Sequence, residues 1–368
     1  IKPVRDLQIH KREKDLVVAT HGRSFWIMDD ITPLRELARR RQVGQVRSDQ
    51  MLVFKPRHAY RMEGGNGGGR GGGAEAGENA ENGVLVRYFL PAKPTKELRL
   101  QFLTEKGDTI ISYSDRKDKK GKPLTISKEF YEDVKLKRPG TIAVQLGLNQ
   151  FVWDMRYPDA VSVEGLNVMW SGDGVGAKVV PGRYRVRLLH GDSLVSEQPI
   201  EIMKDPRITV SDADYAEQFA FVQKCNDKLS EVHRGINQLR TVRAAVNGYL
   251  GAVKDSTLIK KFTTVTKPML AELDVLEGTL MQPKAKAPQD VLAFPIRLND
   301  KLAGLASMMA NADGKPTKAA HVVYADLVRQ IDVALAKLKE VTGKQVPAFN
   351  QLVTEQKIPA IVVDSKGF

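Results

Sequence analysis

The sequence has a single cysteine, Cys225, which excludes a disulfide within the chain and any cysteine-based metal site. So few cysteines suit the cytoplasm and also many bacterial periplasmic proteins, but they argue against a disulfide-rich eukaryotic ectodomain. There is no apolar run of about 18 residues, the length that a membrane-spanning helix needs, so we expect no transmembrane segment. A length of 368 residues allows two or three domains.

Sequence motifs for catalysis are also lacking. No Gly-x-Ser-x-Gly elbow occurs, and Cys225 falls on an apolar helical face, where a core position is expected rather than a nucleophile. None of the histidines has HExxH spacing or the Glu-x-x-His repeat of helical di-iron sites, so we interpret each as a solvated or hydrogen-bonded structural residue. The six histidines are His10, His21, His58, His190, His233 and His321. We expect no catalytic residue, metal or cofactor in this chain.

Negative charge is in deficit, with 57 Lys and Arg against 44 Asp and Glu and a formal net charge of +13. This excess suits nucleic acid, but equally a solvated basic surface or affinity for anionic membranes or glycans. Basic residues cluster only briefly, at 39–41 and 116–120. We find no recognition helix, zinc-finger spacing or aromatic RNA-binding signature, so specific nucleic-acid binding is not expected.

The chain is organised around residues 15–34, DLVVATHGRSFWIMDDITPL. Residues 16–20 and 25–28 are strand-forming apolar runs separated by the turn sequence HGRS, and residues 4–10 precede them as a further strand. Three short antiparallel strands joined by tight turns make up most of a propeller blade.

This strand region indicates a larger parent protein. Two strands bury too little apolar surface to be stable alone, almost nothing precedes them, and the chain begins with Ile1 rather than Met. We therefore expect the polypeptide to be the C-terminal part of a longer protein. Thr32 as N-cap and Pro33 as first helical residue then predict a short helix over residues 34–40.

The middle of the chain has the pattern of an all-β domain. Residues 64–73, GGNGGGRGGG, predict a flexible surface loop rather than a phosphate-binding loop, because no strand-loop-helix context ending in Lys-Ser/Thr follows. Beyond them, about seven short strands with regular turns are typical of an immunoglobulin-like β-sandwich. Phe151 and Trp153 are two residues apart, so we expect them on one core face. A short strand is also predicted before the loop, at residues 51–54. The seven strands after the loop cover residues 84–90, 98–103, 109–113, 140–146, 149–154, 184–189 and 194–202.

From residue 209 onward, apolar residues recur every three or four positions, which predicts four helices in an antiparallel, up-and-down bundle. Pro268 either kinks or restarts the second helix, and Gly343 is expected to end the fourth. The apolar run 358–363 is expected to pack back onto one of the domains. The predicted boundaries are 1–45 for a terminal propeller blade, 46–83 for a linker with the Gly-rich loop, 84–208 for the sandwich, 209–345 for the bundle and 346–368 for a tail.

The candidate ligand-binding residues are His21, Arg23, Trp26 and Asp30. A loop at a propeller face presents Arg to an anion and Trp to a sugar or peptide. In the structural interpretation, which we favour, Arg23 and Asp29 or Asp30 lock the turns of the blade while Trp26 fills the space between blades. Asp29 and Asp30 do not flank a glycosidic bond together, because adjacent strand residues point to opposite faces. Either one remains a candidate partner for a carboxylate located upstream.

The same stretch at residues 15–34 resembles the final blade of bacterial BNR-repeat, sortilin-like β-propeller proteins, which are often named glycosyl hydrolases or exo-sialidase-like. The sequences LNQFVWDMRYPDA at 148–160, PGRYRVRLLHGD at 181–192 and KDPR at 204–207 resemble the β-sandwich that follows the propeller in this family. The helical region and a Phe-Asn pair near the tail resemble the family's C-terminal region.

The resemblance implies an exported protein, in the periplasm or at the cell surface, whose propeller binds peptides or proteins. It carries no catalytic residue onto this chain, because the propeller is almost entirely upstream. Our first hypothesis is a non-catalytic structural or protein-interaction module that contacts the upstream propeller and a protein, peptide or glycan partner. The alternative is part of a sialidase-type glycoside hydrolase whose active site lies upstream. A basic nucleic-acid-binding protein is the second alternative.

Overall fold

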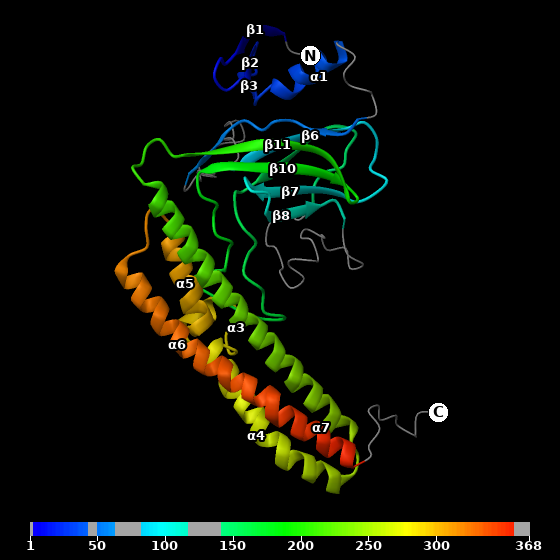
Figure 1. Cartoon of the computed structure of the whole chain (residues 1–368), viewed down its shortest axis with the longest axis vertical. Helices are drawn as coiled ribbons and strands as arrows, with labels where there is room; N and C mark the ends of the chain where they lie inside the picture. Colours follow the sequence, from blue (N-terminus) through cyan, green and yellow to red (C-terminus); the bar gives the residue numbers. More distant parts are fainter. Residues whose placement is uncertain (1–2, 43–49, 63–81, 117–140, 357–368) are drawn as a thin grey trace. The chain divides into compact units, whose positions relative to one another are not determined.

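The computed structural model describes residues 3–42, 50–62, 82–116 and 141–356. The protein is mixed α and β, with sheets in its first part and helices in its second (Figure 1). It divides into two compact units, the second of which combines residues 159–177 with the chain from residue 213 onward. In the described ranges, no helix has the length and apolarity to cross a membrane. The predicted Gly-rich loop at 64–73 and apolar run at 358–363 lie outside the described residues.

The described residues of the first unit form three sheets, in the strand orders β1-β2-β3, β5-β11-β10-β7-β8 and β4-β6-β9. All paired strands are antiparallel except β5 and β11, which are parallel. The elements are β1 (Val4–Ile9), β2 (Leu16–Thr20), β3 (Phe25–Met28), α1 (Thr32–Gln42), β4 (Leu52–Val53), β5 (Ala59–Arg61), β6 (Val84–Leu90), β7 (Leu98–Thr104), β8 (Thr109–Ser114), β9 (Gly147–Trp153), β10 (Gly182–His190) and β11 (Ser193–Lys204). The sequence pattern does not predict β5, because three residues are too few to show a period.

The second and third sheets share one apolar core. Residues of β6 alternate between buried and half-buried, as the sequence pattern predicts for a strand with one face inward. Phe102 of β7 stacks on Trp153, with the two ring centroids 4.5 Å apart. The ring centroid of Phe151 lies 6.2 Å from that of Phe102. The prediction that Phe151 and Trp153 share the core face is therefore confirmed.

The strand predicted over residues 140–146 is wrong for its described part, which forms only an isolated bridge at Thr141. The side chain of Asn149 supplies the hydrogen bonds instead. Its amide donates to the carbonyls of Gln145 at 2.7 Å and Gly147 at 3.1 Å, and its oxygen accepts from the Gln145 N–H at 2.9 Å. These local bonds satisfy the backbone in place of a strand ladder, so the segment forms a loop before β9.

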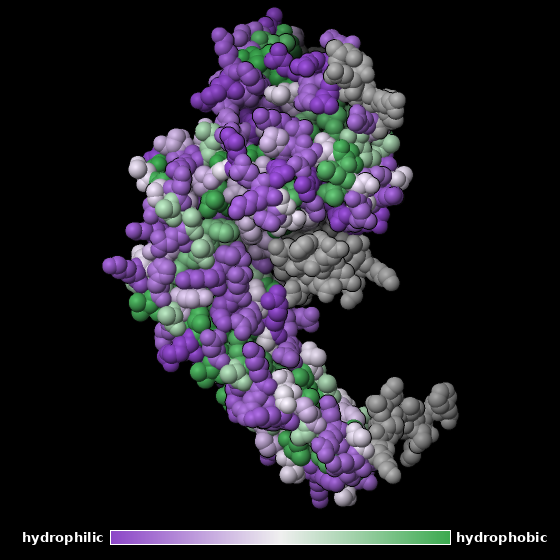
Figure 2. Space-filling model, viewed as in Figure 1, coloured by the Kyte–Doolittle hydropathy of each residue, from purple (hydrophilic) through white to green (hydrophobic). Residues whose placement is uncertain are grey.

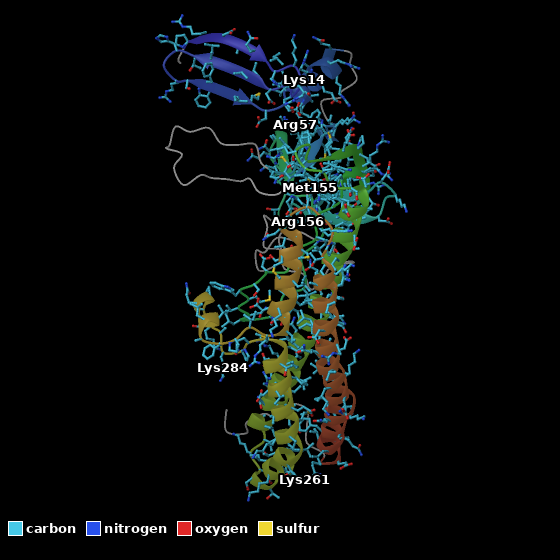
Figure 3. All side chains as sticks on the ribbon, turned by 90° about the vertical axis from the view of Figure 1, so that its left-hand side faces the viewer. Lys14, Arg57, Met155, Arg156, Lys261 and Lys284 are labelled. Carbon is cyan, nitrogen blue, oxygen red and sulfur yellow. The ribbon has the colours of Figure 1, made fainter. Side chains whose placement is uncertain are left out.

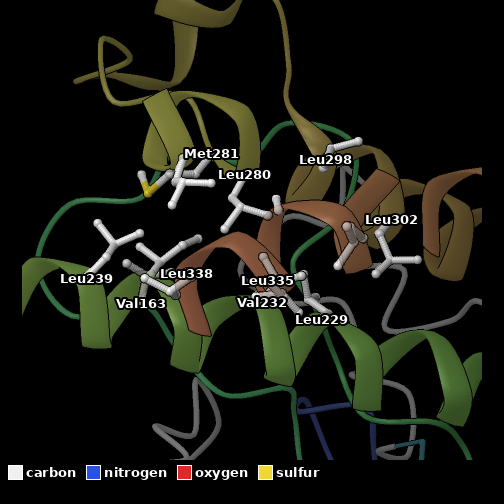
Figure 4. Packing of buried hydrophobic residues seen from close by; sticks show 14 of the residues in the cluster. Val163, Leu229, Val232, Leu239, Leu280, Met281, Leu298, Leu302, Leu335 and Leu338 are labelled. Atoms are coloured by element: carbon white, nitrogen blue, oxygen red, sulfur yellow. The ribbon is translucent and has the colours of Figure 1, made fainter. Parts of the chain in front are cut away.

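The second unit is helical from residue 213 onward. Its elements are α3 (Asp212–Ala252), α4 (Ser256–Leu280), the 3₁₀ turn η1 (Pro288–Leu292), α5 (Leu298–Ala310), α6 (Lys318–Glu340), the π turn η2 (Val341–Gln345) and α7 (Val346–Glu355). α4 continues through Pro268 as one helix. One apolar core joins these helices, and Figure 4 shows leucines from four of them within this core: Leu239 of α3, Leu280 of α4, Leu302 of α5 and Leu338 of α6.

The predicted helix end at Gly343 is wrong, because the chain passes through η2 directly into α7. Phe349 of α7 is buried, and its ring centroid lies 5.7 Å from that of Tyr249 and 5.9 Å from that of Phe262. The predicted tail over 346–368 therefore begins with a helix. Its burial depends on aromatic partners about a hundred residues earlier in the chain, which no local pattern reveals.

Residues 159–177 pack with the helices and not with the 84–208 region to which the sequence assigned them. This segment has no regular secondary structure, so its buried backbone groups need other partners. Asp300 of α5, which is fully buried, accepts from the N–H groups of Trp170 at 2.9 Å and Ser171 at 2.7 Å. Similar bonds join Ser230 to Val161, His233 to Val161, Asn237 to Glu164 and Asn226 to Val175. Buried and half-buried polar residues of α3 and α5 thus hold the segment.

Two glycines let this segment cross α5 with the two backbones in contact. A Cβ added to Gly304 would lie 2.5 Å from the Cβ of Ser171, and one added to Gly172 would lie 2.3 Å from the carbonyl oxygen of Ala303. Both distances are too short for real contacts, so a side chain at either position would push the segment off the helix.

We predict that Gly304→Ala lowers the free energy of unfolding, although alanine is the better helix former. Gly278→Ala in α4 is the matched control, because an added Cβ there meets nothing within 4 Å. The control should raise the free energy of unfolding by about 0.5–1 kcal/mol. Urea denaturation measures both. A Gly304→Ala variant as stable as the control would contradict the close contact.

A buried ion-pair cluster links α3 to α4. The carboxylate of Glu277 accepts from Nε of Arg240 at 2.7 Å and from Nη1 of Arg243 at 2.5 Å. Arg240 also donates to the carbonyl of Glu164 at 2.6 Å, which ties residues 159–177 to the same cluster. Burial raises the pKa of Glu277, but the guanidinium hydrogen bonds outweigh it and hold the pKa below its ordinary 4.5.

We predict that Glu277→Gln lowers the free energy of unfolding at neutral pH by about 2 kcal/mol, the value of hydrogen bonds to a charged group. Because folding lowers the pKa of Glu277, its stabilisation is present above the ordinary value and is lost as pH falls through the folded-state value. The difference in Tm between wild type and variant should be constant from about pH 6 to 8 and shrink below about pH 4.5.

Glu340→Gln is the control for this experiment, since Glu340 forms exposed ion pairs with Lys337 and Lys344. Exposed pairs contribute little, so its Tm should stay close to that of the wild type. A Tm difference for Glu277→Gln that persists unchanged to low pH would show that the carboxylate charge is not what stabilises the cluster.

Candidate interaction surface

The three-stranded sheet β1–β3 follows from two tight turns whose residues adopt positive φ. Lys14 has φ 62° in the first turn, and Gly22 and Ser24 have φ 79° and 56° in the second. The N–H and hydroxyl of Thr20 both donate to the Ser24 carbonyl, which closes the second turn. The resulting register places Trp26 opposite Val18 and Met28 opposite Leu16.

Both faces of this sheet carry exposed apolar side chains. Because neighbouring strand residues alternate between faces, Trp26 and Met28 point to one side and Phe25 and Ile27 to the other. Leu7 and Ile9 of β1 join the side of Trp26 through the shared register. Trp26 is 60% exposed and Phe25 71%. Hydrophobic residues are visible at the surface of this part of the chain in Figure 2.

An apolar surface of this kind is a candidate for covering by protein. A sheet with one solvated face alternates apolar and polar residues, whereas a sheet that is apolar on both faces is covered on both. Exposed apolar patches on soluble proteins mark interaction sites. We call the two faces together the apolar sheet surface, defined by Leu7, Ile9, Phe25, Trp26, Ile27 and Met28.

The predicted site residues divide into two places. His21 and Arg23 are exposed in the turn before β3, and Trp26 lies near that end of the strand. Asp30 follows the other end of β3, roughly 20 Å from Arg23 at about 3.3 Å per strand residue. In the described residues Asp30 pairs with Arg87 and not with Arg23, for which no ion pair is found there.

Arg87 of β6 is the residue that holds Asp30, and no sequence motif marks it as a site residue. Its guanidinium donates to the carbonyls of Asp30 at 2.9 Å and Asp29 at 2.7 Å, and it pairs with the Asp30 carboxylate at 3.2 Å. Burial lowers the pKa of Arg87, and the charges of Asp30 and Asp29 oppose that effect. The pair is separated by 57 residues, so no local signal points to it.

Asp30 also organises the turn into α1. Its own N–H donates to the Asp15 carboxylate at 2.8 Å, and its carboxylate accepts from the Thr32 N–H at 3.1 Å. Asp30 thus satisfies the first turn of α1, and Thr32 is the first helical residue rather than the N-cap that the sequence predicted. With φ 49°, Asp30 adopts the left-handed conformation that aspartate tolerates better than most residues.

Cys225 is buried in the helical core, and burial raises the pKa of its thiol to about 12, so it stays protonated at neutral pH. Within the described residues, His, Cys, Asp and Glu side chains form no group of three or more that could hold a metal ion.

Comparison of the chain with protein-family models, with curated proteins and with solved structures gives no match in any of the three.

We predict that Arg87→Met detaches β1–β3 and the start of α1 from β6. The variant removes hydrogen bonds to two carbonyls and one carboxylate, so the free energy of local opening should fall by about 2 kcal/mol. Hydrogen exchange of the β2 and β3 amides measures it. Arg183→Met, at an exposed position of β10, is the control and should leave this exchange unchanged. Equal protection in both variants would mean that Arg87 does not anchor the sheet.

Proposed function

We propose that this chain is a non-catalytic C-terminal module of an exported, sortilin-like β-propeller protein, with structural and protein-interaction functions. In this proposal β1–β3 are part of the last propeller blade. The two sheets around Trp153 are an immunoglobulin-like β-sandwich, and α3–α7 are an antiparallel bundle. The propeller identity and the exported location rest on the sequence resemblance of residues 15–34, 148–160 and 181–207.

The apolar sheet surface is the observation that supports the proposal best. In a propeller each blade is a small sheet packed between two neighbours, so both of its faces are apolar. Burying one large apolar side chain contributes about 1.5–3 kcal/mol, which makes six exposed ones costly to leave in water. Covering by neighbouring blades explains why two opposite faces are apolar, whereas a single partner docking on one face would not.

The open edges of this sheet are a second support. Among the described strands, β1 and β3 each pair only with β2, so one edge of each is unpaired. Unpaired edges of short, apolar strands are an aggregation hazard that proteins cover or pair. Propeller blades have four strands, one more than are present here, so a further strand would complete the sheet at one edge.

The test uses the polypeptide encoded immediately upstream of Ile1 in the same reading frame. Produced separately, it should bind the 368-residue chain in a one-to-one complex. Trp26→Ser/Met28→Ser removes apolar area from one face, and Phe25→Ser/Ile27→Ser from the other. Each pair should weaken binding at least tenfold, since about 1.4 kcal/mol corresponds to a factor of ten. Isothermal calorimetry measures the affinities.

The matched control is Val275→Ser/Val333→Ser, which removes two equally exposed apolar side chains from α4 and α6. It should bind like the wild type. If only one face pair weakens binding, the sheet docks on a single partner surface and is not a blade between two others. Turnover of aryl glycosides, sialosides included, by the 368-residue chain alone would refute the non-catalytic part of the proposal.

A further inference from the structure

A basic cavity lies beside α1, on the chain that follows the three-stranded sheet. Its volume is about 780 Å³, and it is lined by Lys14, Thr32, Arg35, Glu36, Arg39 and Arg40 among others. Five of these side chains come from consecutive turns of α1, and Lys14 comes from the turn between β1 and β2, where Figure 3 labels it. The volume falls in the range of about 300–1,000 Å³ that is usual for small-molecule sites.

The charges of the cavity do not cancel. Among the described residues that line it, Lys14, Arg35, Arg39 and Arg40 are four cations against one carboxylate, Glu36, an excess of three positive charges. Glu36 already forms an ion pair with Arg40, whose Nη2 lies 2.5 Å from Oε1 of Glu36. Throughout the described residues, neither Arg35 nor Arg39 has an ion pair. Two guanidinium groups therefore face the cavity region without a counter-charge.

The arrangement of these cations is unfavourable without a ligand. Arg35 and Arg39 are four residues apart on one helix, so they are neighbours on its surface, and like charges at this spacing destabilise a helix. The first turn of α1 contains no acidic residue that would offset them. An anion bound between the two side chains would remove the repulsion.

Lys14, which comes from outside α1, is held in place by hydrogen bonds of its own. Its backbone N–H donates to the His10 carbonyl at 2.8 Å, and its own carbonyl accepts from the Ile31 N–H at 2.9 Å. The ammonium donates to the Lys11 carbonyl. Because Ile31 immediately precedes α1, these bonds fix the ammonium relative to the helix that carries the arginines.

We propose that this cavity binds a small ligand with two phosphate or sulfate groups. A guanidinium fork matches the oxygens of such groups with two parallel hydrogen bonds, and an ammonium adds a third point of charge. Two unpaired guanidiniums and one ammonium suit two oxyanion groups better than one. The described lining residues include no aromatic side chain, so the recognition that we propose rests on charge rather than on stacking. The inference is independent of the propeller proposal.

The experiment titrates the 368-residue chain with inorganic pyrophosphate in isothermal calorimetry at about 50 and 150 mM salt. Saturable binding at one site is expected at both salt concentrations. Arg35→Gln/Arg39→Gln should weaken it at least tenfold. Arg35→Lys/Arg39→Lys keeps the positive charges but loses the forked guanidinium groups. Its affinity for pyrophosphate should therefore lie between those of the wild type and of Arg35→Gln/Arg39→Gln. Thermal unfolding of each variant verifies that it is folded.

The control for total charge is Arg5→Gln/Arg183→Gln, which removes two exposed arginines from β1 and β10 of the same unit. It should bind within twofold of the wild type. Equal weakening in both double variants, or no saturable binding by the wild type, would overturn the site. A second arm with a disulfated disaccharide distinguishes an inorganic ligand from a sugar carrier: binding of either probe that Arg35→Gln/Arg39→Gln abolishes supports the site.

Discussion

The need to satisfy buried backbone groups outside helices and strands shapes much of this structure. A buried N–H or C=O without a partner destabilises a protein by an amount comparable to a lost hydrogen bond, so irregular segments persist only where side chains reach them. Asp300 does this for residues 170–171, Asn149 for the loop before β9, and Arg87 for the carbonyls that follow β3. In each case a polar side chain from a regular element fixes an irregular segment, which explains why these polar residues are buried.

Charge is used in two different ways in the two units. In the helical unit the buried carboxylate of Glu277 is paired with two guanidiniums, because an unpaired buried charge is strongly unfavourable. Near α1, by contrast, the described residues that line an open cavity include four cations and one carboxylate. This cavity accounts for part of the net charge of +13 that the sequence left without a function. Because the cations near α1 are solvated, their mutual repulsion is weak and their charge remains available to a ligand.

The apolar sheet surface connects the fold to the proposed function. Its two faces and two free edges are features that a completed blade buries, and Arg87 attaches the sheet to β6. The link through Asp29 and Asp30 gives this aspartate pair a structural function: they receive Arg87 and begin α1. Candidate ligand contacts therefore concentrate at the other end of β3, around His21, Arg23 and Trp26.

The sequence by itself determined most of the regular elements, because the period of apolar residues reflects which face of a strand or helix is buried. Strand β6, the long helix α3 and the core position of Trp153 all follow from local spacing. The sequence also predicted the strands around Trp26, but it did not predict that both faces of their sheet are exposed. Only the tertiary structure decided that residues 159–177 belong with the helices, that the chain after residue 345 is helical, and that Asp30 pairs with Arg87. These outcomes depend on contacts between residues tens to more than a hundred positions apart, and such contacts leave no period in the sequence.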